Sequence, residues 1–327
     1  MSDVETWVVT DGKSGMENQC VGLAEAVGLP FAVKRIDLPA PWRWLSPQII
    51  AAAPERLGAR GDRLPPPWPR LLIATGRASV GPAMVIRRRS NGATFAVQIQ
   101  NPGVAARHFD LIVAPEHDRL TDANVISTVG ALHRVTPERL AAEARTFAPA
   151  LAHLPRPLLA VLVGGNNKSF RFDAAVAARL GEGLASLCER SGAGLAVTVS
   201  RRTGVEATAA LRDRLRNLPA VLWDGTGANP YFGYLGLADA IVVTCDSVSM
   251  TSEAAGTGKP VYVFDLPGRR RKFDAFHASL LRRGITRPFA GALEQWTYQP
   301  PRDTERVAAE VRRRLELAPL SRISGSP

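Results

Sequence analysis

The stretch from Thr244 to Pro260 holds the residue types that a phosphorylated nucleotide would need. A β-branched apolar run ends at Thr244, a turn rich in hydroxyl side chains follows, and a predicted helix carries Glu253 about one turn inside it. Unpaired N–H groups at the start of such a helix attract a diphosphate. A carboxylate accepts hydrogen bonds from ribose hydroxyls. The pattern therefore predicts nucleotide binding by this turn, with Phe232, just upstream, flanking the base.

Two further turns offer groups that could bind the phosphates. Gly164 and Gly165 follow the apolar run Leu158–Val163, and consecutive glycines let the backbone approach a pyrophosphate closely. Asn166 and Lys168 come directly after them. Arg201 and Arg202 follow another apolar run, and the forked donors of arginine suit phosphate oxygens. We expect these residues to belong to the same donor-binding site.

The first strand-to-helix turn, Asp11–Gln19, is also dense in polar side chains. Gly12-Lys13-Ser14 resembles the end of a P-loop, but the glycine that a P-loop needs five residues earlier is Trp7. The GxGxxG fingerprint of dinucleotide-binding proteins is missing from this turn as well. These departures argue against a P-loop kinase and a dehydrogenase. The turn is interpreted as a site for another substrate, together with Arg77 and Asn101, which follow two later strands.

Parallel sheets would bring these turns together. Short apolar runs alternate with helical periodicity along the chain, a pattern typical of sheets that helices cover on both faces. The predicted fold class is α/β, with two Rossmann-like domains. Three prolines in Ala148–Pro157 mark the boundary between a first domain, 1–150, and a second, 151–302. Ser14 and Glu17 have capping-box spacing before the first helix. The runs read as strands are Thr6–Thr10, Arg70–Ala74, Thr94–Ile99, Leu111–Ala114, Leu158–Val163, Gly194–Ser200, Ala220–Trp223, Ala240–Thr244 and Pro260–Phe264, and those read as helices are Glu17–Val27, Pro137–Phe147, Asp173–Ser191, Val205–Leu215 and Thr304–Leu317.

The charge balance narrows the class of partner. A net charge of +11 fits nucleic acid, an anionic membrane or a phosphorylated substrate. Nucleic acid is not expected, because only 6% of the residues are aromatic and no basic cluster carries interleaved aromatic residues for base stacking. Pro41–Ile50 joins tryptophans, apolar residues and a cation, which predicts either peripheral contact with an anionic membrane or interior packing.

Several features indicate the compartment. The N-terminus is acidic, which argues against an export signal, and no apolar run is long enough to cross a bilayer. Three scattered cysteines without CxxC spacing fit reduced thiols and argue against metal ligation by these residues. We expect a cytoplasmic protein, peripheral at the inner face of the plasma membrane if it binds lipid.

The run Ser249-x-x-x-Glu253-Ala254-x-x-x-Gly258-Lys259-Pro260 resembles the nucleotide-binding motif of GT-B glycosyltransferases, including the N-acetylglucosaminyltransferase that makes lipid II and the Kdo transferases. The resemblance implies a ribose-binding role for Glu253 and phosphate-binding roles around Ser247, Val248, Ser249, Met250 and Thr251. It also implies that the Gly164-Gly165 turn is a second phosphate element. Two domains would face a central cleft, with the final stretch, 303–327, returning toward the first domain.

Over nearly its whole length the chain resembles the mitochondrial-fission, or "elongated mitochondria", family, which has bacterial members. The motifs that carry this likeness are Thr10–Gln19, Gln98–Pro102, Gly164-Gly165-Asn166 and Asp246–Ala254. Non-hydrolysing UDP-N-acetylglucosamine 2-epimerases are also similar: they carry Asp-Ser-Gly-Gly before their ribose glutamate. Asp246-Ser247 match that turn, but Val248 and Ser249 replace its glycines.

These likenesses imply a metal-independent glycosyltransferase that uses a nucleotide-sugar as substrate and needs no cofactor. A nucleotide-sugar epimerase and a non-catalytic scaffold are the alternatives. Kdo transferases place a glutamate on the corresponding first turn, so Glu17 is the expected base for a lipid-linked or saccharide acceptor, with Asp11 second. Lys168, Arg201 and Arg202 would stabilise the leaving phosphate. The acceptor-binding side chains would be Lys13, Asn18, Gln19, Arg77 and Asn101.

Overall fold

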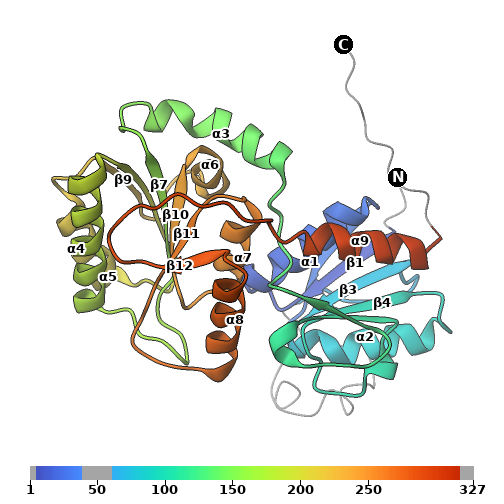
Figure 1. Ribbon diagram of the computed structural model, residues 1–327. Helices are drawn as coiled ribbons and strands as arrows, with labels where there is room; N and C mark the ends of the chain where they lie inside the picture. Colours follow the sequence, from blue (N-terminus) through green and yellow to red (C-terminus); the bar gives the residue numbers. More distant parts are fainter. Residues whose placement is uncertain (1–4, 39–60, 317–327) are drawn as a thin grey trace. The chain divides into compact units, whose positions relative to one another are not determined.

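The computed structural model describes residues 5–38 and 61–316, which form two compact units. Unit 1 comprises the chain up to Arg134 together with the stretch from Arg302 onward, and unit 2 comprises Val135–Pro301. Each unit is built on a six-stranded parallel sheet, as the alternation of apolar runs and helices predicts (Figure 1). The α/β fold class with two Rossmann-like units is therefore confirmed. Pro41–Ile50 lies outside the described residues.

The sheet of unit 1 has the strand order β2-β1-β3-β4-β5-β6. Its elements are β1 (Thr6–Thr10), α1 (Ser14–Val27), β2 (Phe31–Arg35), β3 (Leu71–Thr75), α2 (Arg77–Arg89), β4 (Phe95–Ile99), β5 (Leu111–Pro115), β6 (Val125–Thr128) and α9 (Asp303–Arg314). Alternate residues of the buried strands enter separate hydrophobic clusters on the two faces: Leu71 and Ile73 of β3 on one, Leu72 and Ala74 on the other. Continuous apolar strands follow from this two-sided burial.

The last helix, α9, belongs to unit 1, where it packs beside α1 (Figure 1). Its Val307 and Val311 are fully buried in the same cluster as Leu23 of α1. Burial of each such valine contributes about 1.5–3 kcal/mol. Asp303, at the start of α9, accepts a hydrogen bond from the Val129 amide at 2.8 Å. The chain thus leaves unit 2 at Pro301 and completes the core of unit 1.

The sheet of unit 2 has the strand order β12-β11-β10-β7-β8-β9. Its elements are α3 (Pro137–Leu151), β7 (Leu158–Val163), α4 (Ala174–Ser191), β8 (Gly194–Val199), α5 (Val205–Leu215), β9 (Ala220–Trp223), α6 (Tyr231–Leu237), β10 (Ala240–Thr244), α7 (Val248–Gly256), β11 (Val261–Phe264), α8 (Arg271–Arg282) and β12 (Thr286–Pro288).

Unit 2 begins at Val135, ahead of the proline-rich stretch in which we expected the boundary. The reason is the packing of α3, the helix just before those prolines. Its Leu140 and Phe147 lie so close to α6 that a Cβ atom on Gly233 or Gly236 would collide with them. Helix α3 is therefore part of the second unit.

The predicted capping box at Ser14 is wrong. Lys13 is the N-cap residue of α1, and no side chain caps the helix there. Two interactions explain the difference. The Asp11 carboxylate accepts from the Lys13 amide at 3.3 Å, and Glu17, which should reach back to the cap, instead binds Arg35.

In residues 5–38 and 61–316, no helix is long and apolar enough to cross a membrane.

Candidate nucleotide and acceptor sites

The topology of each sheet defines one place where ligands bind in α/β proteins. In unit 2, β8 is the neighbour of β7 on one side and β10 is its neighbour on the other. The strand order therefore reverses between β7 and β10. In unit 1 the reversal lies between β1 and β3. The carboxyl ends of strands at such a reversal flank the ligand crevice of open α/β sheets. The turns after β7 and β10, and those after β1 and β3, carry most of the candidate residues, while Arg201 and Arg202 follow β8 and Asn101 follows β4.

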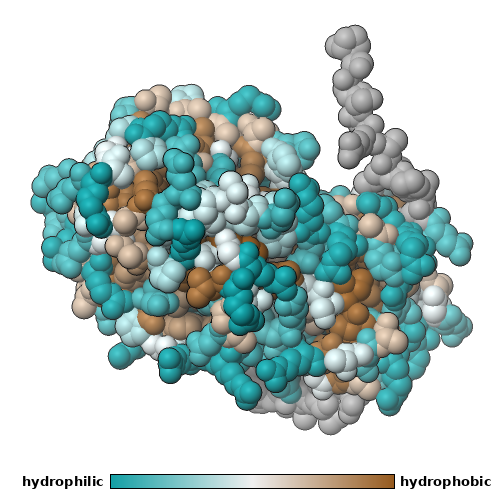
Figure 2. Space-filling model, in the orientation of Figure 1, coloured by the Kyte–Doolittle hydropathy of each residue, from teal (hydrophilic) through white to brown (hydrophobic). Residues whose placement is uncertain are grey.

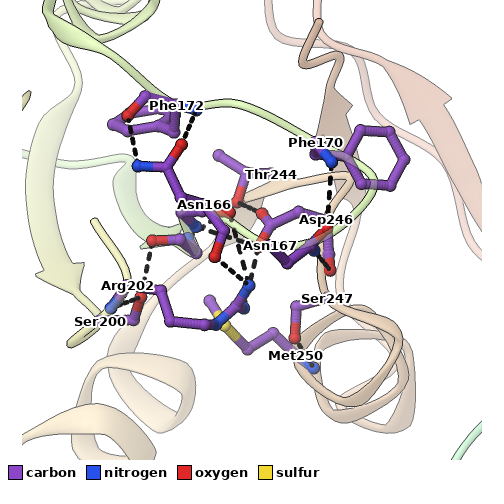
Figure 3. A network of polar contacts seen from close by, with 12 residues as sticks. Asn166, Asn167, Phe170, Phe172, Ser200, Arg202, Thr244, Asp246, Ser247 and Met250 are labelled. Carbon is purple, nitrogen blue, oxygen red and sulfur yellow. Dashed lines mark hydrogen bonds and ion pairs between the residues drawn. The ribbon is translucent and has the colours of Figure 1, made fainter. Parts of the chain in front are cut away.

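Asp246 is the centre of a polar network at the carboxyl ends of the unit 2 strands (Figure 3). Its carboxylate is fully buried and accepts a hydrogen bond from the Thr244 hydroxyl at 2.6 Å and one from the Gly165 amide at 3.0 Å. Arg202 forms an ion pair with it at 2.9 Å. A buried carboxylate is tolerated only with such partners. Asp246 therefore joins the turns after β7, β8 and β10.

The Gly164-Gly165 turn is held from inside the protein. The Gly164 amide donates to the Thr244 hydroxyl at 2.8 Å, and the Gly165 amide donates to Asp246. The Asn166 amide donates to the Arg202 carbonyl at 2.9 Å, and the Asn167 amide to the Phe170 carbonyl at 3.1 Å. These four N–H groups thus form hydrogen bonds within the fold. The two glycines are needed because a Cβ atom on Gly164 would collide with the Asp246 carboxylate, and one on Gly165 with the Arg202 backbone.

A Gly164→Ala variant is expected to lower the free energy of unfolding of unit 2 by about 2–3 kcal/mol, as overpacking at a rigid site does. An added Cβ would lie 2.6 Å from the Asp246 carboxylate carbon. Urea denaturation followed by circular dichroism measures the change. Gly192→Ala is the control, because that glycine has φ +67° but open space around its Cβ position. It should cost only about 1 kcal/mol of backbone strain, and an equal loss in both variants would contradict the steric argument.

The cations expected to face the phosphates lie in different surroundings. Arg202 forms its ion pair with Asp246, and its side chain is 40% exposed. Its turn is held by Ser200 and Thr203, whose hydroxyls both donate to the Gly164 carbonyl, at 2.6 and 2.5 Å. The Arg201 and Lys168 side chains are exposed. Lys168 and Arg201 are therefore the more accessible cations, while Arg202 mainly fixes the network.

Helix α7 begins at this network and offers the anion-binding groups that the Gly164-Gly165 turn does not. Ser247 is its N-cap, and the Ser247 hydroxyl accepts from the Met250 amide at 3.3 Å. The first-turn amides of Val248 and Ser249 have no intrahelical acceptor, as in every α-helix. Both residues are half-buried, whereas Thr251 faces the interior. The positive end of the helix dipole thus lies at the sheet reversal.

Glu253 is one and a half turns into α7 and is buried. Tyr231, at the start of α6, donates its hydroxyl to the Glu253 carboxylate at 2.6 Å. Burial, and then the neighbouring Glu253, raises the pKa of the Tyr231 phenol well above its usual range. Phe232 follows Tyr231 and packs edge-on against its ring. The expected ribose and base residues are therefore in contact through Tyr231.

Lys259 of the Gly258-Lys259-Pro260 motif has a structural role. Its ammonium donates to the carbonyls of Leu235 and Gly236, both at 2.7 Å, at the C-terminal end of α6. A cation there complements the helix dipole. Burial lowers the pKa of Lys259 to about 8. By holding α6, Lys259 helps to position Tyr231 against Glu253.

The candidate acceptor residues of unit 1 lie after β1, β3 and β4. Glu17 makes a two-pronged ion pair with Arg35 at the end of β2, at 2.7 and 2.8 Å. Asp11 pairs with Lys13. Gln19 is buried and donates to the Gly15 carbonyl at 3.0 Å, so it stabilises the first turn of α1 from within.

The other residues of this set are more accessible. Asn18 is half-buried, and Arg77 is exposed at the start of α2. Asn101 is exposed, and its side chain accepts from the Gly103 amide at 2.8 Å. The reversal between β1 and β3 brings Asp11, Glu17 and Arg77 to one edge of the sheet, and Asn101 follows β4, the next strand.

Four residues that organise these sites are not among the site residues predicted from the sequence: Asp246, Asn167, Tyr231 and Arg35. Asn167 donates to the Asp246 carbonyl at 3.2 Å and fixes the loop before α4 through its side-chain oxygen. Asp246 could have been found from the likeness of Asp246-Ser247 to the epimerase turn. No local signal indicated Arg35, because its pairing with Glu17 depends on the adjacency of β1 and β2. Among the described residues, no group of three or more histidine, cysteine, aspartate or glutamate side chains could hold a metal ion.

Comparison with known proteins gives a consistent result. A family model described as mitochondrial fission ELM1 matches residues 14–315. The mitochondrial fission protein ELM1 of Arabidopsis thaliana is 34% identical over 274 residues, which cover 76% of this chain. This chain spans 64% of the length of that plant relative.

Two solved structures show the same architecture. The UDP-GlcNAc 2-epimerase of Methanocaldococcus jannaschii has a TM-score of 0.55 at 11% identity, with 94% of this chain and 99% of the enzyme covered. Os79 of O. sativa in complex with UDP has a TM-score of 0.53 at 12% identity, with 94% and 92% covered. Identities this low establish the fold alone, and the fold is of the GT-B type.

Proposed function

The chain belongs to the mitochondrial fission ELM1 family, and from its GT-B-type fold and its site we propose that it is a glycosyltransferase that binds a nucleotide-diphosphate sugar on unit 2. One observation carries the proposal. The start of α7, with its first-turn amides and Glu253, lies at the sheet reversal beside the Asp246 network. The solved neighbours with the same architecture act on or bind UDP compounds.

In this proposal the α7 amides of Val248 and Ser249 bind the diphosphate, with Lys168 and Arg201 as exposed counter-charges. Glu253 accepts the ribose hydroxyls, and Phe232 flanks the base. Because Tyr231 occupies one Glu253 oxygen, ribose either shares the carboxylate with the phenol or displaces it. Glu17 takes the proton from the hydroxyl of a lipid-linked or saccharide acceptor.

A thermal-shift screen of the full chain with UDP-, GDP-, ADP-, dTDP- and CMP-sugars tests the donor class. We expect a UDP-sugar to stabilise the protein most, by about 2.7 kcal/mol at a concentration one hundred times its Kd. A response to none of the five classes would contradict the proposed function. It would leave the non-catalytic scaffold as the better description.

A nucleotide-sugar 2-epimerase is the second candidate, because Asp246-Ser247 match the epimerase turn and Asp246 is the centre of the network. Such an enzyme needs no acceptor. Incubation with UDP-GlcNAc alone, followed by proton NMR, tests this candidate: inversion at C2 favours the epimerase, whereas an unchanged donor contradicts it.

A Glu253→Gln variant is expected to bind the nucleotide about 10–100 times more weakly. Hydrogen bonds to a charged acceptor contribute about 1.5–3 kcal/mol each, and glutamine keeps the shape while it removes the charge. Isothermal titration with the nucleotide found in the screen measures the change. Tyr231→Phe is the matched control, since it removes the phenol hydroxyl but leaves the carboxylate. Unchanged affinity in Glu253→Gln, or an equal loss in Tyr231→Phe, would overturn the ribose-binding role.

A further inference from the structure

Helix α8 and its flanks carry the densest positive charge in the described part of unit 2. Residues 269–283 contain six cations and one acid, Asp274, and so supply a formal excess of five of the chain's +11. The cations are Arg269, Arg270, Arg271, Lys272, Arg282 and Arg283, and all six are exposed. We call these six residues with Leu281 the α8 ridge.

The stability of α8 does not explain the charge at its N-terminal end. Four of the cations are at the N-terminal end of the helix, where the helix dipole disfavours positive charge by about 0.3–1 kcal/mol per residue. Within the described residues, Arg269, Arg270 and Arg271 form no ion pair with a carboxylate. By contrast, Arg212 and Arg216 of the same unit bind Asp224 and Asp213. Within the described residues, the charge of these three arginines at the start of α8 is therefore not balanced by a paired carboxylate.

The outer side of α8 exposes an apolar side chain as well as cations. Phe276 and Leu280 are buried on the inner side. Arg271, Ala275 and Arg282 follow helical spacing along the outer side, and Leu281 beside them is 51% exposed. Twelve residues extend about 18 Å. Elsewhere on the face drawn in Figure 2, hydrophilic residues cover most of the surface and hydrophobic residues lie in scattered patches. The ridge thus has cations at both ends and an exposed leucine between them.

We propose that the α8 ridge docks on a phospholipid membrane that carries anionic headgroups. Guanidinium groups bind phosphate through paired N–H donors, and arginine and lysine with an apolar residue between them match a headgroup layer. Single-stranded nucleic acid fits less well, because it needs exposed aromatic rings for stacking. The aromatic residues of the segment, Phe273 and Phe276, are half-buried and buried, and Phe273 packs against Phe170 with ring centroids 5.1 Å apart.

The start of the ridge is tied to the turn that follows β7. The Arg171 amide donates to the Pro267 carbonyl at 2.9 Å, and Phe170 forms a backbone bridge with Gly268. Both loops leave the carboxyl edge of the unit 2 sheet. A docked ridge would therefore hold the candidate nucleotide site close to the membrane, which suits a lipid-linked acceptor; this last step alone rests on the proposed function.

Co-sedimentation of the full chain with vesicles, without nucleotide, tests the docking surface. We expect binding to vesicles of phosphatidylcholine with about one third phosphatidylglycerol, little binding to pure phosphatidylcholine, and release by about 0.5 M salt. Arg270→Gln/Arg271→Gln should weaken binding roughly 25-fold, since each cation near an anionic surface contributes about fivefold. Arg88→Gln/Arg89→Gln, at the exposed end of α2, removes the same charge and is the matched control.

Three results would overturn the proposal: no binding to the anionic vesicles at low salt, an equal loss in the α2 control, or tighter binding of a single-stranded RNA that depends on the same two arginines. Urea denaturation of both double variants checks that each is folded. Because no nucleotide is present, failure here leaves the thermal-shift result untouched, and failure of the nucleotide screen leaves the vesicle result untouched.

Discussion

An Asp246→Asn variant is expected to lose about 3 kcal/mol of unfolding free energy in unit 2 and to lose nucleotide binding. The buried carboxylate accepts from Thr244 and Gly165 and balances the charge of Arg202. An amide in its place turns an acceptor into a donor and leaves the guanidinium without its counter-charge. Breaking a buried ion pair typically costs 3–5 kcal/mol. We take the low end because Arg202 is 40% exposed and water can solvate it.

Urea denaturation and isothermal titration measure the two effects of this substitution. The control is Asp213→Asn, in which an exposed carboxylate loses its pairing with Arg216. Exposed pairs contribute at most about 1 kcal/mol, so the control should remain near the wild-type value. An Asp246→Asn protein with wild-type stability and affinity would show that the network is incidental to both fold and site.

Glu17→Gln is expected to lower the rate of sugar transfer about 10²–10⁴-fold while it leaves nucleotide binding unchanged. Loss of a general base reduces the rate by this amount, and Glu17 belongs to unit 1, whereas the proposed nucleotide site belongs to unit 2. In the structure both Glu17 oxygens accept from Arg35. If Glu17 is the base, the pair with Arg35 must loosen when the acceptor binds.

Glu25→Gln is a closely matched control for this experiment. Glu25 is on the same helix, α1, and makes the same two-pronged contact with an arginine, Arg134, with the guanidinium Nε at 3.0 Å. It lies at the other end of the helix, away from the sheet reversal. Radiolabel transfer from the donor found in the screen measures both variants. Retained turnover in Glu17→Gln, or equal losses in the two, would remove the catalytic role of Glu17.

The strands buried on both faces could be predicted from sequence with little error. Thr6–Thr10, Leu158–Val163 and Ala240–Thr244 have the predicted bounds, because each is a continuous apolar or β-branched run that two-sided burial requires. The strands that escaped prediction are β2, β6 and β12, all at the edge of a sheet. Edge strands such as Phe31–Arg35 are half-exposed, so their sequences lack the apolar continuity that reveals a buried strand.

Helices were predictable to a similar extent where an apolar stripe recurs, as in Val205–Leu215. Helix α2 was missed because Pro82 lies inside it and its last three residues are arginines. Helix α8 was missed because it starts with consecutive cations, which propensity and the helix dipole do not favour. In both cases packing of a few buried side chains decides the structure, as with Phe276 and Leu280 of α8.

The sequence by itself determined which turns carry the polar residues, because a turn after an apolar run can be recognised locally. Only the tertiary structure decided which of those residues meet. Asp246 binds Arg202, Glu253 binds Tyr231 and Glu17 binds Arg35, in each case between segments that are separated in the sequence. Each pairing depends on strand order and register, which no local pattern encodes. For the same reason the residues from Thr244 to Pro260 predicted an anion-binding helix start, whereas only the fold showed that the Asp246 carboxylate is buried at the centre of the polar network.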